Sequence, residues 1–187
     1  MNFVEAVNSS LIKNYATFKG RACRAEWWYF FLFGVIASIL AILIVFVLNF
    51  SILPVFFEQY MGYVEADDKN GTNFAARFMI ESELGKQLIM AELVVSLALF
   101  LPAFAVTVRR VQDLDASYYW ALPYLIIMLI DLWYSIFPLE TLAELATRLG
   151  GLIFLVTIVY LLAFVRRGSF DNNRFGPDPL DLEEDTY

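Results

Sequence analysis

Three short polar segments, far apart in the sequence, carry most of the residues that could do chemistry. They cover residues 20–28, 109–113 and 172–179, and each contains arginine and at least one acid. Arginine suits phosphates and carboxylates because its planar fork can donate two parallel hydrogen bonds. The candidate binding residues are Arg21, Arg24, Glu26, Arg109, Arg110, Asp113, Asn173, Arg174 and Asp178. We expect these residues to form one polar cap in which the acids pair with the arginines.

A simpler interpretation is that the arginines only orient the chain in a membrane, while Trp27 and Trp28 anchor it at the interface. That interpretation accounts for the arginines and tryptophans. It leaves the neighbouring acids unexplained, and also the turn at 172–179.

The composition excludes several kinds of active site. The chain has no histidine, so imidazole bases, Ser-His-Asp triads and Cys/His metal sites are excluded. Cys23 is the single cysteine, which rules out an intrachain disulfide and a redox pair. The sequence has no glycine-rich phosphate loop, nucleophile elbow or zinc motif. An EF-hand register on Gly71 fails because Ala66 and Arg77 then fall on ligand positions. We therefore predict a protein that is not an enzyme, with no catalytic residue, metal or cofactor.

Long uncharged apolar runs place these polar segments in a membrane protein. Of the 187 residues 60% are hydrophobic and 18% are charged, whereas soluble domains carry about 25% charge. About 20 helical residues cross the roughly 30 Å hydrocarbon core, and a helix satisfies its own backbone there. We predict an all-α membrane domain over 20–167, with transmembrane helices at about 27–50, 88–108, 118–139 and 149–165 and an outer loop at 51–86.

Basic residues predict the orientation of these helices. With both termini cytoplasmic, the inner side holds nine of the 13 lysines and arginines and the outer side holds four. This distribution satisfies the positive-inside rule. The cytoplasmic tail at 168–187 is acidic, so the chain offers no basic patch for nucleic acid.

Residues 1–19 are predicted to form an amphipathic helix, because apolar residues recur at intervals of four and three. The stripe consists of Phe3, Val7, Leu11, Tyr15 and Phe18. It fits two arrangements equally well. The stripe could lie flat on the membrane surface, or it could pack against the protein's own cytosolic loops.

Glu92 and Asp131 are acids well inside predicted spans. Intramembrane acids are costly and often mark ion or proton paths, although either could simply hydrogen-bond a neighbouring helix.

Small residues also recur along one face of the first span, at Gly34, Ala37, Ser38 and Ala41. Such a face allows close helix approach. It would serve packing within the chain or a homo-oligomer.

The chain resembles the domain of unknown function 805 family of small bacterial inner-membrane proteins. The resemblance extends from the N-terminal helix to Pro179 and depends on the segments 18–28, 109–113 and 173–179. The family usually has a histidine where this chain has Gln112, and a glycine-bearing turn where it has 114–117. The resemblance implies the fold and the bacterial inner membrane, and it supplies no reaction.

These observations favour a structural or interaction subunit whose cap contacts anionic membrane lipids or a partner protein. The first alternative is a small transporter or channel component that uses Glu92 and Asp131. An enzyme acting on lipid headgroups is the last alternative, since nothing in the sequence places a nucleophile.

Overall fold

The computed structural model describes residues 1–67, 74–137 and 140–180. Residues 68–73 of the predicted outer loop, residues 138–139 at the end of the predicted third span, and residues 181–187 of the tail lie outside these ranges. In the described ranges the regular secondary structure is helical, with no strand beyond a single bridge between Asn173 and Gly176.

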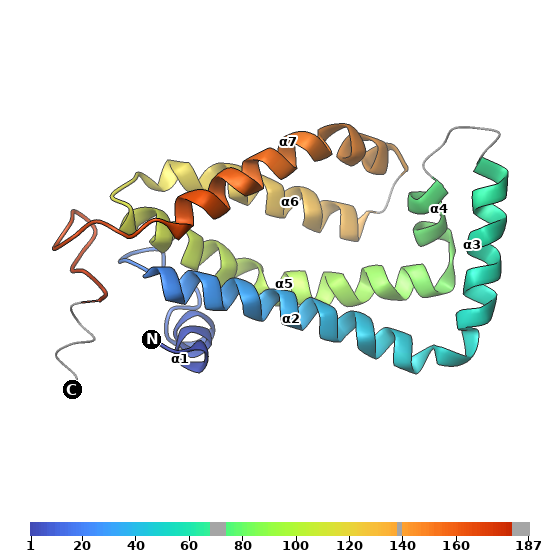
Figure 1. Cartoon of the computed structure of the whole chain (residues 1–187), viewed down its shortest axis with the longest axis horizontal. Coiled ribbons are helices and arrows are strands. Elements are labelled where there is room, and N and C mark those ends of the chain that lie inside the picture. Colours follow the sequence, from blue (N-terminus) through green and yellow to red (C-terminus); the bar gives the residue numbers. More distant parts are fainter. Residues whose placement is uncertain (68–73, 138–139, 181–187) are drawn as a thin grey trace. The chain divides into compact units, whose positions relative to one another are not determined.

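Each predicted span coincides with a helix (Figure 1). These helices are α2 (Arg24–Leu48), α5 (Glu83–Asp113), α6 (Leu122–Ile136, after a 3-10 turn at Tyr118–Ala121) and α7 (Glu140–Val165). Among the described residues, α2 and α5 are long and apolar enough to cross a membrane. Tyr118–Trp133 and Leu149–Val165 are shorter apolar segments.

The segment predicted as an outer loop contains two helices. Its polar sequence had given no helix prediction there. After a 3-10 turn at Phe50–Ile52 come α3 (Leu53–Asp67) and α4 (Phe74–Glu81). Phe78 is buried, and its ring centroid lies 4.7 Å from that of Phe56 and 5.3 Å from that of Tyr60. This aromatic contact joins α4 to α3.

The chain divides into two compact units. The first comprises Met1–Val35, Ala98–Leu129 and Leu152–Tyr187, and it holds all the predicted cap residues. The second comprises Ile36–Leu97 and Ile130–Gly151, and it holds both acids of the predicted spans.

Trp27 lies at the centre of the first unit's core. Its indole Nε1 donates to Thr107 Oγ1 at 3.2 Å, and its ring stands edge-on to Phe164 with centroids 4.8 Å apart. This core packs the start of α2, the end of α5 and the end of α7 together. The buried members of the cluster are Ala22, Trp27, Phe30, Val106, Val108, Val111, Ala121 and Phe164.

The N-terminal helix is shorter than predicted. It consists of α1 (Phe3–Asn8), with a capping box between Asn2 and Glu5, and a π-helical turn at Ser9–Lys13. The helix therefore ends before Tyr15 and Phe18. The chain turns there because Asn14 leaves helical geometry and its carbonyl accepts from Thr17 N.

The apolar stripe of this helix partly faces the protein itself. The Phe3 ring lies 6.0 Å from the Tyr29 ring, and Leu11 packs against the core. Val4 and Ile12 are exposed on another side. Of the two arrangements open from the sequence, these contacts favour packing against the chain for the predicted stripe.

The small face of the first span also packs within the chain. In the first unit, a side chain at Gly34 would lie 3.8 Å from Leu99. In the second unit, Ser38 donates to Glu92.

Candidate functional site

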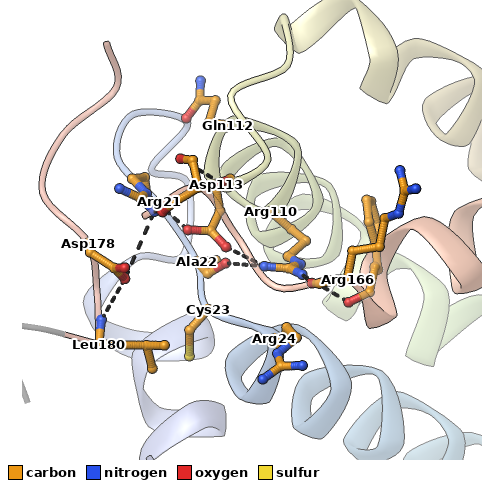
Figure 2. Close-up of polar contacts among 12 residues, drawn as sticks. Arg21, Ala22, Cys23, Arg24, Arg110, Gln112, Asp113, Arg166, Asp178 and Leu180 are labelled. Carbon is orange, nitrogen blue, oxygen red and sulfur yellow. Dashed lines mark hydrogen bonds and ion pairs between the residues drawn. The ribbon is translucent and has the colours of Figure 1, made fainter. Parts of the chain in front are cut away.

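The candidate site is a cluster of buried charges where three segments meet (Figure 2). The last turn of α5 supplies Arg109, Arg110 and Asp113, the residues around the start of α2 supply Arg21 and Glu26, and the chain after α7 supplies Asp178. These are the six charged cap residues that become buried.

Asp113 is the bridge of the cluster. Its Oδ1 accepts from Arg21 Nε at 2.9 Å, and its Oδ2 forms a salt bridge with Arg110. The three side chains are 3%, 1% and 0% exposed. Burial raises the pKa of Asp113, and the charges of Arg110 and Arg21 oppose that rise. Burial likewise lowers the pKa of Arg110, against the pull of Asp113. Desolvation is thus the main cost of this site, and the pairing offsets part of it.

Arg21 fixes the segment after α7. Its Nη1 donates to the carbonyls of Asp171 at 2.6 Å and Gly176 at 3.4 Å, and its Nη2 donates to Ser169. Asp178 Oδ1 lies 3.9 Å from the same Nη2. One guanidinium group therefore holds a chain segment that has no regular secondary structure.

The backbone of this segment also bonds to the end of α5. Ser169 N donates to Asp113 O at 2.8 Å, and Asn173 Nδ2 donates to Gln112 O at 3.0 Å. Asn173 thus joins the cap through its side-chain amide, which donates to a carbonyl of α5 and to Ser169 Oγ.

Arg110 caps the C-terminal end of α7. Its Nη2 donates to Phe164 O at 3.0 Å and also to Arg166 O, while Nη1 reaches Ala22 O at 3.5 Å. The last carbonyls of a helix have no partner within the helix and carry partial negative charge. A buried arginine satisfies both needs, so Arg110 ties α5 to α7.

Arg109 and Glu26 form the second buried pair, with Arg109 Nη2 2.9 Å from Glu26 Oε1. The same oxygen accepts from Ser9 Oγ at 2.9 Å and Ser10 Oγ at 3.3 Å. The N-terminal helix is therefore docked onto the start of α2 through this carboxylate.

Two predicted residues stay outside the cluster. Arg24 is exposed, with its Nη1 3.4 Å from Val165 O. Arg174 is also exposed and pairs with Asp115, with Nε and Oδ1 3.2 Å apart. Both lie on the exposed rim of the cap, whereas Arg21, Arg109 and Arg110 contact the buried acids.

The structure adds residues that sequence reasoning missed, namely Ser9, Ser10, Ser169 and Gly168. At Gly168 an added Cβ atom would overlap the carboxylate of Asp113. Asp113 is held on both sides, so it cannot yield, and glycine is required for the close approach. A lone serine or glycine has no motif, and only the tertiary contact reveals its role.

The turn after α5 forms without a glycine. Ala116 N donates to Val111 O and Asp115 N donates to Gln112 O, which is the Schellman pattern. Asp115 takes the left-handed position at φ 55. Aspartate tolerates this conformation better than most residues.

Gln112 is a buried polar residue at the end of α5. Its Nε2 donates to Phe18 O at 3.0 Å, and its buried Oε1 has no hydrogen-bond partner in the described part of the chain. This amide links α5 to the segment before α2.

The two acids of the predicted spans line one pocket in the second unit. Ser38 Oγ donates to Glu92 Oε1 at 3.1 Å, and Glu92, Asp131 and Ser135 share an open, mainly apolar pocket of about 310 Å³. Within the described residues, no group of three or more acids or cysteines is placed to hold a metal ion.

Comparison with known proteins gives one family match. The sequence profile of DUF805, a family of unknown function, matches residues 15–177. The chain is 25% identical over 169 residues to the inner membrane protein YhaH of Escherichia coli K12, which covers 90% of this chain and 92% of YhaH. It is 26% identical over 170 residues to the inner membrane protein YhaI of the same strain, which covers 91% and 92% of the two chains. No solved structure gives a significant match.

The contrast between buried and exposed arginines gives a testable prediction. Arg110→Ala should lower the free energy of unfolding by about 3–5 kcal/mol, because it leaves Asp113 buried with one partner fewer. Arg174→Ala should cost about 0–1 kcal/mol, since its pair with Asp115 is solvated. Equilibrium unfolding of the purified protein in mixed micelles would measure both. Equal losses for the two variants would show that burial does not set the strength of these pairs.

Proposed function

Since the chain belongs to the DUF805 family, whose function is unknown, we propose a role from the charge distribution of its cap. The protein is an inner-membrane protein. Its proposed role is that of a non-catalytic subunit whose cytoplasmic face binds anionic phospholipid headgroups.

The observation that carries this proposal is the separation of buried from exposed arginines. The buried cap holds three arginines and three acids, Arg21, Arg109, Arg110, Glu26, Asp113 and Asp178, so its formal charges cancel. Arg24, Arg166 and Arg167 are exposed at the adjoining ends of α2 and α7. In the described part of the chain these three form no salt bridge. A structural cap accounts for the buried set, whereas the exposed set is available for a ligand.

The position of exposed aromatic residues supports an anionic lipid, rather than a soluble anion, as the ligand. The side chains of Tyr118, Tyr119 and Trp120 are 50%, 61% and 68% exposed at the turn before α6. Tyrosine and tryptophan concentrate at the headgroup level. Tyr160 Oη donates to Trp120 O, and Arg166 and Arg167 follow Tyr160 by six and seven residues, just past the end of α7 at Val165. The arginines therefore fall near the phosphates of the inner leaflet.

The proposed topology has four spans with both termini in the cytoplasm. It rests on the nine-to-four distribution of basic residues and on the helices at all four predicted spans. This topology makes the cap cytoplasmic, where anionic lipids give the surface a negative potential. A partner protein, or a second copy of the chain, would be the alternative occupant of the same face.

A transporter or channel component is the second candidate, and one observation favours it. Glu92 and Asp131 line the same pocket although they lie on helices distant in sequence. Among the described residues, the side chain of Glu92 accepts one hydrogen bond, from the hydroxyl of Ser38. Two ionised acids in one apolar pocket repel each other and are costly to bury. Protonation or a bound cation would lower this free-energy cost.

Topology is tested by labelling single cysteines in a Cys23→Ala background. We expect a membrane-impermeant maleimide to label Gly62→Cys, on α3, in cells with an intact inner membrane. Lys13→Cys, on the N-terminal helix, should react only after that membrane is permeabilised. The reverse labelling pattern would place the cap on the outer side of the membrane and would contradict the proposed function.

Lipid binding is tested by analysing the phospholipids that copurify in mild detergent. We expect enrichment of phosphatidylglycerol and cardiolipin over their share of the membrane. The triple change of Arg24, Arg166 and Arg167 to glutamine should reduce it, because each basic residue near an anionic surface contributes about 1 kcal/mol.

The matched control changes Lys69, Arg77 and Arg148 to glutamine, which removes the same charge from the predicted outer side. Enrichment that falls equally in both triple variants would contradict the proposed site. Copurification of a stoichiometric protein without lipid enrichment would favour the partner interpretation.

The second candidate is tested by reconstitution into vesicles with an imposed proton or cation gradient. If the acids are structural, the wild-type protein and the Glu92→Gln and Asp131→Asn variants should all show no flux. Flux in the wild type that both variants abolish would replace lipid binding by transport as the proposed function.

A further inference from the structure

We propose that a pocket at the adjoining ends of α2 and α7 binds the phosphate group of an anionic phospholipid, with Arg24 and Arg167 as its two ligands. This inference rests on the proposed function and assigns it to a defined site. In this inference Arg24 and Arg167 contact the phosphate, whereas the neighbouring Arg166 only adds positive charge.

The pocket has a volume of about 100 Å³. Residues 23–25, 167–168 and 178–180 contribute to its wall, together with Asp113. A site for one water needs about 10–15 Å³ measured in this way, so the pocket has room for a group of several heavy atoms. A phosphate fits this size, and the glycerol and acyl chains of a lipid would remain outside.

The two acids in the pocket wall repel a phosphate only weakly, because arginines lie close to both. Asp113 is neutralised by its contacts with Arg21 and Arg110. Asp178 lies 3.9 Å from Arg21, and one of its oxygens accepts from Leu180 N at 3.0 Å. The buried arginines therefore compensate the wall, and the exposed Arg24 and Arg167 add uncompensated positive charge.

Arg167 lies against an aromatic ring. Its guanidinium carbon is 4.1 Å from the centroid of the Phe170 ring. A cation–π contact uses none of the N–H donors in hydrogen bonds, so they remain for a phosphate. The Nη1 of Arg24 lies at the long distance of 3.4 Å from Val165 O. That weak contact leaves the other donors of Arg24 free.

Arg166 provides a matched control within the same turn of chain. It is exposed and carries the same charge, but it does not line the pocket. Figure 2 shows its side chain directed away from Cys23 and Arg24. Its contact with Arg110 uses the backbone carbonyl, which a side-chain substitution retains.

The test measures the melting temperature of the full chain in a nonionic detergent during titration with three probes. These are dihexanoylphosphatidylglycerol, inorganic phosphate, and dihexanoylglycerol as a probe without phosphate. We expect phosphatidylglycerol to stabilise the wild-type protein in a saturable manner and dihexanoylglycerol to have no effect. Arg24→Gln and Arg167→Gln should each weaken the apparent Kd by about tenfold, as expected for the loss of one charge-assisted ligand.

Arg166→Gln should change the apparent Kd by less than about twofold, since a screened surface charge contributes little. Arg167→Lys keeps the charge but loses the planar fork, so it should also weaken binding. This variant keeps the test valid if Arg167→Gln lowers stability in the absence of any probe.

The outcomes separate this inference from the proposed function. Equal weakening by all three glutamine variants would overturn the pocket and leave general binding of anionic lipid in place. The absence of stabilisation by phosphatidylglycerol would overturn both. Equal stabilisation by inorganic phosphate, with the same dependence on Arg24 and Arg167, would support a phosphate site whose ligand is free phosphate.

Discussion

The carboxylate of Asp113, held between Arg21 and Arg110, is the interaction on which the rest of the first unit depends. Each oxygen of the carboxylate has its own arginine. Each arginine in turn holds backbone carbonyls of another segment, after α7 for Arg21 and at the end of α7 for Arg110. A buried carboxylate is costly, and removing one partner costs more than the pair contributes. The arrangement therefore favours a state in which all three segments are docked together.

This pairing divides a set of similar residues into two groups. Arg21 and Arg24 are three residues apart, yet Arg21 is buried against carbonyls and carboxylates, whereas Arg24 faces the exposed rim. Because the buried charges cancel, the cap can be packed at the membrane boundary without a ligand. The exposed arginines are not needed to hold the cap together, so their side chains can contact lipid, as we propose. The buried arginines serve to hold the segments that present them.

The sequence predicted the helical class and the location of four apolar helices, because hydrophobic length and charge asymmetry are local properties of the chain. It also identified the segments that meet in the cap. It missed α3 and α4, since their polar and aromatic residues have no long apolar run. It extended the N-terminal helix to Phe18, because its apolar spacing continues past Lys13 while the backbone turns at Asn14. Gly168 carried no recognisable signal at all, as its role lies in a contact with Asp113.

By itself, the sequence determined that this is a helical inner-membrane protein of the DUF805 family, with arginines and acids gathered at the ends of its helices. The helical membrane class follows from composition and spacing, and the family and the inner membrane follow from the similarity to known proteins. Only the tertiary structure decided which arginine pairs with which acid, which arginines remain exposed, and that Glu92 and Asp131 share a pocket. The physical reason is that burial and pairing depend on how distant segments pack. A guanidinium group fits a carboxylate, a helix end or a phosphate equally well until that packing fixes its neighbours.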